Sequence, residues 1–422
     1  MGTTSASGPK GTGPERCSDG DDAQAGAGEG AAGDDRPPIW SATVGGAPPV
    51  LPTGRAVPYH GTHASCGCCA IRGWPLNVRG SAFIFGCYAD LCAGGGQTSK
   101  GYLVPSIDLS LEELHSYRAQ AVAPADLADF WARTSEQSDS QPLDVTLEAV
   151  GPPLARVGVF RLSFAGFGSG RVTGWYLRPE SEEPVPGVVS FHGYSGRALR
   201  PLEAYPLAAQ GIAVLSMDCR GQAGDSDPVP GASAHAAGWL TQGLEDPWAC
   251  YYRTVYADAV RSIEVLCSFP EVDAARIALT GVSQGGGLTL AAAALSTRPM
   301  FAWADVPFLC DFPRAVQVAT EDPYLEIPRL LVSRPGLAEA AFRTLSYVDV
   351  ANLAPRISCP VVVTVGLWDP ICPPSTIFGM FARISVNDKD LRIYPFNGHE
   401  VVYDNAEARH STLVSRLGAL GA

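Results

Sequence analysis

Short apolar runs recur along the chain from about residue 157 onward, and their pattern changes partway. Residues 157–164 and 172–177 alternate apolar and polar side chains, which is typical of a half-buried antiparallel hairpin. Later runs are mostly continuous in apolar residues, at 185–191, 212–217, 276–280, 301–306, 361–365 and 391–394. Continuous runs of this length indicate strands that are covered on both faces.

Helical periodicity separates several of these strands. It is found at 109–114, 124–135, 202–210, 251–269 and 285–297. In the longest of these segments, one buried stripe is predicted at i, i+4, i+7 and i+11, formed by Tyr256, Val260, Ile263 and Cys267. Alternating strands and helices predict an α/β fold with a mostly parallel sheet wrapped by helices.

The first hundred residues have a different composition. Residues 1–101 hold 21 of the 46 glycines and six of the 12 cysteines, and they show no sustained periodicity. We therefore predict a Gly- and Cys-rich, disordered extension at 1–103, followed by one catalytic domain at 104–422. The possible ligands His60, His63, Cys66, Cys68 and Cys69 cluster in this extension. Their spacing does not match a zinc finger, so we expect a Cys-rich loop without a metal.

Charge and hydropathy exclude some function classes. The net charge of −13 argues against nucleic acid or an anionic membrane as a partner, because such surfaces attract clusters of Lys and Arg. The longest apolar run, around residues 288–295, is too short to span a bilayer. The start of the chain lacks the apolar stretch of a secretory signal, so we expect reduced thiols and a cytoplasmic protein.

The clearest chemical motif is the pentapeptide Gly281-Val282-Ser283-Gln284-Gly285. It follows a predicted strand and precedes an Ala-rich predicted helix, which is the context of a nucleophile elbow. The tight turn requires glycine on both sides of Ser283 and projects its hydroxyl from the sheet. A Gly-rich turn without chemistry is the alternative, and we consider it the weaker one.

A serine nucleophile needs a base, and His is the usual one. In this fold class the order along the chain is Ser, acid, His, which leaves His399 and His410. His399 lies in a turn directly after the last predicted strand, whereas His410 lies in a terminal helix, where a solvated face is expected. We therefore assign the base to His399.

The acid has more candidates. Asp369 follows the penultimate strand and precedes His399 by 30 residues, so its loop is placed to reach the histidine. Asp305 ends the preceding strand, and we expect it to be structural. The other acidic candidates are Asp311 and Asp349, in the insertion beyond that strand, and Glu400, for which a role in the local turn is expected.

Two backbone amides are needed to form an oxyanion hole. One is expected from Gln284, which follows the nucleophile, and the other from Tyr194 in the loop after the strand 185–191. His192 in that loop is expected to shape it, and Arg220 is expected to brace neighbouring loops.

Taken together, these motifs resemble the family-7 carbohydrate esterases, which include acetyl xylan esterases and cephalosporin C deacetylases. The resemblance covers the chain from about Asp108 almost to its end. It is carried by the segments Phe191-His192-Gly193-Tyr194, Arg220-Gly221-Gln222, Gly281-Val282-Ser283-Gln284-Gly285-Gly286, 305–310, 342–347, 366–376 and His399-Glu400.

The resemblance implies an α/β-hydrolase fold and a metal-independent serine esterase without a cofactor. Its substrates would be small acetylated sugars such as xylo-oligosaccharides, or cephalosporin C-like metabolites. It implies that the triad is formed by Ser283, Asp369 and His399, that the amides of Tyr194 and Gln284 form the oxyanion hole, and that Arg220, Gly221 and Gln222 give structural support. It also implies a homo-oligomer, by analogy a hexamer.

Two other readings remain open at this point. The chain is alternatively another α/β-hydrolase, such as a carboxylesterase or peptidase that acts on a small metabolite, because fold does not fix substrate. A non-catalytic binding protein on this scaffold is the third reading. Such proteins usually lose the serine or the histidine, whereas this chain has all three triad candidates.

Overall fold

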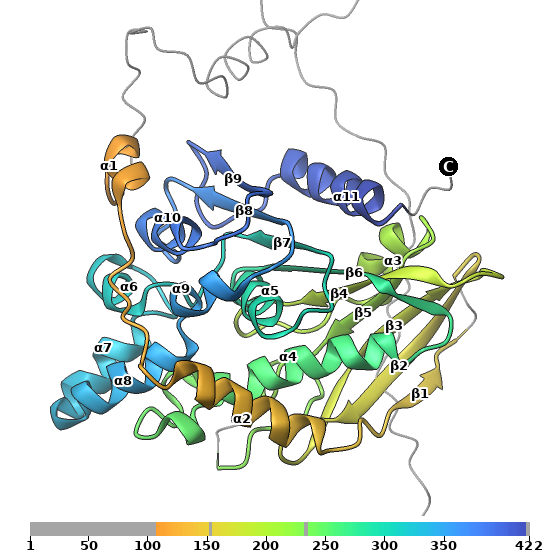
Figure 1. Cartoon of the computed structure of the whole chain (residues 1–422), viewed down its shortest axis with the longest axis horizontal. Helices are drawn as coiled ribbons and strands as arrows, with labels where there is room; N and C mark the ends of the chain where they lie inside the picture. Colours follow the sequence, from red (N-terminus) through yellow and green to blue (C-terminus); the bar gives the residue numbers. More distant parts are fainter. Residues whose placement is uncertain (1–106, 152–153, 232–234, 419–422) are drawn as a thin grey trace, which may run out of the picture. The chain divides into compact units, whose positions relative to one another are not determined.

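The computed structural model describes residues 107–151, 154–231 and 235–418, and its centre is a nine-stranded sheet (Figure 1). The strand order is β1-β2-β3-β5-β4-β6-β7-β8-β9. Pairings from β1 through β3 to β5 are antiparallel, and all the others, from β5 to β9, are parallel. The strands are β1 (Thr146–Ala149), β2 (Val157–Ala165), β3 (Arg171–Pro179), β4 (Val185–Phe191), β5 (Ala213–Met217), β6 (Val272–Val282), β7 (Phe301–Asp305), β8 (Val361–Gly366) and β9 (Lys389–Tyr394).

Helices cover both faces of this sheet. They are α1 (Leu111–Ser116), α2 (Leu127–Asp139), α3 (Pro201–Ala208), α4 (Tyr251–Cys267), α5 (Gln284–Leu295), α6 (Phe312–Val318), α7 (Glu326–Ser333), α8 (Ala338–Val348), α9 (Val350–Leu353), α10 (Pro374–Ala382) and α11 (Tyr403–Leu417). None of the helices within the described residues is long and apolar enough to cross a membrane.

The two faces of the sheet carry two separate cores. In β4, Val188 packs with residues of α3 and α11, whereas its neighbour Val189 packs with residues of α4 and α5. Successive strand residues point to opposite faces, so a continuous apolar strand supplies both cores. Every residue of β4, β5, β7 and β8 is accordingly buried. The predicted α/β fold and its mostly parallel, helix-wrapped sheet are confirmed.

Three parts of the fold differ from the sequence prediction. β1 was not predicted, because all four of its residues are exposed and the strand has no buried face to produce alternation. The insertion between β7 and β8 folds into α6, α7, α8 and α9, which lacked a recognised pattern. The single stripe predicted for α4 is too narrow, because that helix is buried on most of its surface between α2, α5 and the sheet.

The parallel strands bring the loops that carry the candidate catalytic residues to one edge of the sheet. The carboxyl ends of β4, β6, β8 and β9 lie at the same edge of the sheet, so the loops that follow them converge there. The predicted extension, with its cluster from His60 to Cys69, lies outside the described residues.

Candidate active site

Ser283 lies on a strained turn between β6 and α5. Its φ and ψ angles are 59° and −119°, a conformation that L-residues rarely adopt and that costs about 1–3 kcal/mol. Its own amide donates to the carbonyl of Asp305 (2.9 Å), and its carbonyl accepts from the amide of Phe308 (3.0 Å). These backbone bonds hold the turn in place from β7 and the loop beyond it.

The flanking glycines are required by close approach of the backbone. A Cβ at Gly281 would collide with the backbone of Gly285, and a Cβ at Gly285 would collide with the carbonyl group of Phe191. The two glycines of the sequence motif therefore meet a steric requirement of this turn.

His399 joins Ser283 to Asp369. Its Nε2 lies 2.8 Å from the Ser283 Oγ, and its Nδ1 lies 2.7 Å from the Asp369 Oδ2. A carboxylate only accepts hydrogen bonds, so Nδ1 carries the ring proton and Nε2 is free to accept the proton of the serine hydroxyl. The side chain of His399 is 19% exposed, whereas that of Asp369 is fully buried.

Asp369 is itself held by two backbone amides. Its Oδ1 accepts hydrogen bonds from the amides of Ile371 (2.9 Å) and Cys372 (2.8 Å). The loop that contains Asp369 is also joined directly to the loop that contains His399, because the amide of Trp368 donates to the carbonyl of Asn397 (2.9 Å). Asp369 therefore presents its second oxygen to the histidine in a fixed orientation.

Asp305 contacts a different set of partners. Its Oδ1 accepts from Trp303 Nε1 (2.8 Å), Thr364 Oγ1 (3.1 Å) and Asn405 Nδ2 (2.8 Å), and its Oδ2 pairs with Arg409. These bonds connect β7, β8 and α11, so Asp305 has the structural role expected of it.

The other acidic candidates are also held by hydrogen bonds to backbone amides. Asp311 accepts from the amides of Gln120 and Ala121, and Asp349 accepts from those of Asp311 and Phe312. Burial raises the pKa of Asp349 to about 7. Glu400 accepts from the amide of Gly398 (3.0 Å) and from the side chain of Asn397, within its own turn as predicted.

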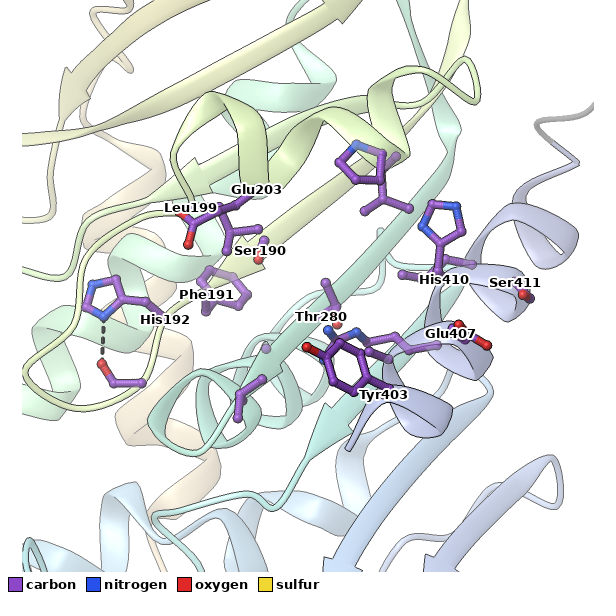
Figure 2. Close-up of a pocket in the computed structure, with 18 residues that line it drawn as sticks. Ser190, Phe191, His192, Leu199, Glu203, Thr280, Tyr403, Glu407, His410 and Ser411 are labelled. Atoms are coloured by element: carbon purple, nitrogen blue, oxygen red, sulfur yellow. Dashed lines mark hydrogen bonds between the residues drawn. The ribbon is translucent and has the colours of Figure 1, made fainter. Parts of the chain in front are cut away.

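His410 lies away from the serine. It is half-buried on α11 and lines a cavity of about 640 Å³ between α3 and α11. Figure 2 shows Tyr403, Glu407 and His410 facing Leu199 and Glu203 across this space.

The loop after β4 lies against the nucleophile. A Cβ at Gly193 would be 3.7 Å from the Cβ of Ser283, so the Tyr194 amide belongs to the immediate surroundings of the serine. Gln284 is the first residue of α5, and its amide has no partner among the described residues. Amides at a helix N-terminus favour negative charge, which suits them to an oxyanion.

The side chain of Tyr194 is fixed by contacts that the sequence did not reveal. Its hydroxyl donates to the carboxylate of Glu326 (2.8 Å) and accepts from the amides of Gly238 (3.3 Å) and Leu240 (3.2 Å). Burial raises the pKa of Tyr194 and also that of Glu326. The partners come from α7 and from the segment before α4, far away in sequence.

The segment 220–222 supports the loop after β4 through hydrogen bonds made by Gln222. Gln222 Oε1 accepts from the amide of Ser195 (3.0 Å), and Gln222 Nε2 donates to Gln284 Oε1 (2.9 Å). Tyr252 donates a further bond to Gln284 Oε1 (2.9 Å). The side chain of Gln284, and not only its amide, is therefore part of the support, which the sequence motif alone did not indicate.

Arg220 and Gly221 have structural surroundings as well. Arg220 is fully buried and pairs with Asp258 (2.7 Å), and it also donates to the carbonyl of Phe167 (2.9 Å). Gly221 has a φ of 64°, which glycine adopts readily. The contacts of Arg220 join the segment after β5 to the loop between β2 and β3 and to α4.

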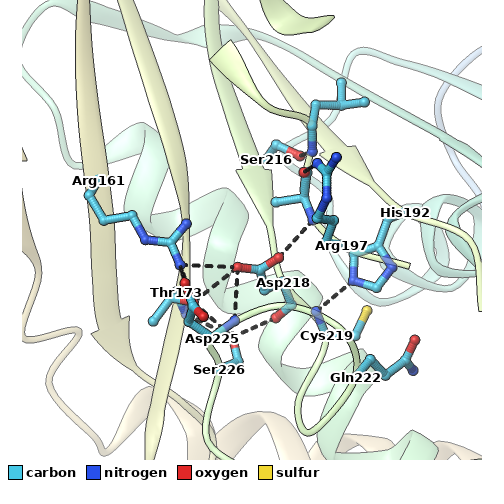
Figure 3. Close-up of polar contacts among 12 residues, drawn as sticks. Arg161, Thr173, His192, Arg197, Ser216, Asp218, Cys219, Gln222, Asp225 and Ser226 are labelled. Atoms are coloured by element: carbon cyan, nitrogen blue, oxygen red, sulfur yellow. Dashed lines mark hydrogen bonds and ion pairs between the residues drawn. The ribbon is translucent and has the colours of Figure 1, made fainter. Parts of the chain in front are cut away.

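His192 shapes the loop instead of contacting the serine. Its Nε2 accepts from the amide of Cys219 (2.9 Å), as Figure 3 shows, so its Nδ1 donates to the carbonyl of Gly193 (2.7 Å). Burial lowers the pKa of His192, which keeps the ring neutral. Asp218 secures the next part of the loop by accepting from the amide of Ala198 (2.7 Å).

One group of possible metal ligands occurs within the described residues. A carboxylate oxygen of Asp369, the Cys372 sulfur and a ring nitrogen of His399 all lie within 4.8 Å of one another. Two of these three residues already form the hydrogen-bonded chain to Ser283.

Comparison with known proteins identifies relatives of the whole described region. Residues 104–417 match the family model described as acetyl xylan esterase (AXE1). The chain is 35% identical to a solved acetyl xylan esterase from Paenibacillus sp. R4, with a TM-score of 0.69 over 73% of this chain and 99% of that one. It is 31% identical to acetyl xylan esterase 1 from Thermoanaerobacterium sp. JW/SL YS485, with a TM-score of 0.70 and the same coverage.

A longer curated relative matches in part. The chain is 27% identical to acetyl esterase Axe7A from Xylanibacter ruminicola over 283 residues, which are 65% of this chain. The match spans 63% of the length of that relative.

Proposed function

Because the chain belongs to the acetyl xylan esterase family, a family of carboxylic ester hydrolases with the α/β-hydrolase fold, we propose that it removes acetyl groups from small acetylated carbohydrates. The observation that carries the proposal is the hydrogen-bonded chain from the Ser283 hydroxyl through His399 to Asp369. Nucleophile, base and orienting acid are the parts that acyl transfer requires.

In the proposed first step, the Ser283 Oγ attacks the acetyl carbonyl carbon and His399 Nε2 takes the hydroxyl proton. Asp369 remains ionised and stabilises the resulting imidazolium through Nδ1. The tetrahedral intermediate then collapses, the sugar hydroxyl leaves with the proton from His399, and the acetyl group remains on Ser283. Water repeats the sequence in the second half, which releases acetate and regenerates the serine.

The carbonyl oxygen becomes negative in both halves of the reaction. We assign its stabilisation to the amides of Tyr194 and Gln284, which flank Ser283 from the loop after β4 and from the start of α5. One such donor typically contributes about 10²–10³ in kcat. The bonds from Gln222 to Ser195 and Gln284 tie both donors to one buried support.

For the substrate, the proposal names acetylated xylo-oligosaccharides first and the acetyl ester of cephalosporin C-like metabolites second. The names of the two solved relatives support the first class. The test is a panel of p-nitrophenyl esters of increasing acyl length, acetylated xylobiose, cephalosporin C and aminoacyl anilides, with Ser283→Ala as the blank.

The expected result is Ser283-dependent release of acetate with a preference for acetyl over longer acyl groups. Turnover of the anilides but not of the acetyl esters would favour a peptidase. A protein that neither turns over any ester nor reacts with a fluorophosphonate probe would favour the binding-protein reading.

Two further features belong to this proposal. We place the catalytic domain at 104–422 and treat residues 1–103 as an extension without a catalytic role; the family match from residue 104 supports this division. We also propose a homo-oligomer, by family resemblance a hexamer, which sedimentation velocity of the full chain would test.

A further inference from the structure

Cys372 lies directly beside the proposed triad. It is fully buried, and its amide donates to Asp369. Its sulfur, an Asp369 oxygen and a His399 nitrogen lie within 4.8 Å of one another. The serine mechanism uses the histidine and the aspartate but has no step for the thiol.

The donor set of these three residues is the one that zinc prefers. Thiolate, neutral imidazole and carboxylate bind Zn²⁺ at about 2.0–2.3 Å, so bound donors lie roughly 3.3–3.6 Å apart in a tetrahedral site. The present donors lie within 4.8 Å of one another, so ion binding would require the three side chains to adjust. The charges also balance, because one thiolate and one carboxylate neutralise a divalent cation, which lowers the cost of burying it.

We propose that Asp369, Cys372 and His399 form an inhibitory site for a thiophilic divalent cation, with Zn²⁺ as the principal ligand. The proposal concerns regulation of the proposed esterase site and rests on that function. The cation would not be a cofactor, since it occupies groups that catalysis needs.

Inhibition follows from the ring nitrogen that faces Asp369. An ion shared by Asp369, Cys372 and His399 binds Nδ1, which lies 2.7 Å from the Asp369 Oδ2. The ring proton then moves to Nε2, which donates to Ser283 instead of accepting from it. The Cys372 thiol releases one proton to solvent, the imidazole stays neutral, and the serine keeps its proton.

Ion chemistry gives the site a recognisable signature. The sulfur ligand favours Zn²⁺ and Cd²⁺ over Mg²⁺ and Ca²⁺, which prefer oxygen ligands.

The experiment uses the full chain after treatment with EDTA and its removal. Hydrolysis of p-nitrophenyl acetate is measured against zinc chloride, cadmium chloride and magnesium chloride at one fixed pH. We expect inhibition by the first two salts, little effect of the third, and full reversal by EDTA. For each variant, inhibition is expressed relative to its own metal-free rate.

The decisive variant is Cys372→Ser, which keeps the shape but replaces the soft ligand. It should weaken zinc inhibition by about tenfold or more. Cys267→Ser is the matched control, because Cys267 is a more accessible free thiol on α4, outside the group. Equal zinc inhibition of wild type and Cys372→Ser would overturn the proposal, as would loss of inhibition in Cys267→Ser alone.

Two measurements on wild type do not depend on turnover of an ester. Cobalt chloride should produce a sulfur-to-cobalt charge-transfer band that exceeds the one in Cys372→Ser, and zinc should slow the labelling of Ser283 by a fluorophosphonate. If the esters are not hydrolysed but zinc still protects Ser283, the proposed function fails and the metal site stands. If the esters are hydrolysed and zinc neither inhibits nor protects, the metal site fails alone.

Discussion

Replacing Asp369 with asparagine should disable the histidine by reversing its protonation pattern. The two amides of Ile371 and Cys372 lie 2.9 and 2.8 Å from Oδ1, and both are donors. They select the asparagine orientation in which the amide oxygen stays at Oδ1. The NH₂ group then faces His399 Nδ1, which must become an acceptor, so the ring proton moves to Nε2 and points at Ser283.

The size of the effect follows from that tautomer. A histidine that donates to the serine cannot take its proton, and the loss of this function in serine triads is about 10⁴-fold in kcat. This corresponds to about 5.4 kcal/mol of transition-state stabilisation. KM should change little, because Asp369 is fully buried behind the histidine.

Asp305→Asn is the matched control. Asp305 is also a fully buried carboxylate at the end of a parallel strand, but it pairs with Arg409. Breaking a fully buried pair costs about 3–5 kcal/mol of stability. The Arg409 side chain is 24% exposed, so the cost here should be smaller. The melting temperature of Asp305→Asn should therefore fall while its kcat stays close to that of wild type. The assay is steady-state hydrolysis of p-nitrophenyl acetate together with a thermal melt of each variant. Near-normal kcat in Asp369→Asn, or a larger loss of kcat in Asp305→Asn, would refute the assignment.

Three further predictions concern the nucleophile, metals and the extension. Ser283→Ala should lower acetyl-ester hydrolysis by about 10⁴-fold or more with little change in the melting temperature, and a purified variant with normal turnover would contradict the assignment. Prolonged EDTA treatment should leave activity intact or raise it; loss on chelation with recovery on adding zinc would mean that the mechanism needs a metal. A chain that begins at Val104 should fold and hydrolyse acetyl esters like the full chain, as judged by soluble yield, melting temperature and kcat. Aggregation of the shortened chain would show that the extension belongs to the folded enzyme.

The sequence predicted those parts of the site that depend on local backbone geometry. The sequence singles out Ser283 because the turn needs glycine on both sides, and this requirement appears as a short motif. It singles out His399 and Asp369 because each lies in the loop after a strand, and parallel strands bring such loops together.

The rest of the site depends on contacts between distant segments. Glu326 fixes Tyr194 across 132 residues, and it belongs to an insertion whose helices had no recognised pattern. The side chain of Gln284 meets Gln222 and Tyr252 only after β5, α4 and α5 have packed together. Cys372 was noted only as part of a motif, because its nearness to Ser283 depends on how the loop after β8 folds back. A buried polar partner leaves no periodic trace in the sequence, so only the folded structure reveals it.

The histidine lies in the loop after an edge strand of the sheet. That strand, β9, stands at the end of the strand order beside β8, and its residues are all at least partly exposed. Strands of this kind open locally at a lower free energy than the core. When β9 separates from β8, His399 leaves the serine even though the rest of the domain remains folded. On heating, activity should therefore be lost at a lower temperature than the melting temperature of the domain. The stability of the β8–β9 pairing would then set the highest temperature at which the enzyme works.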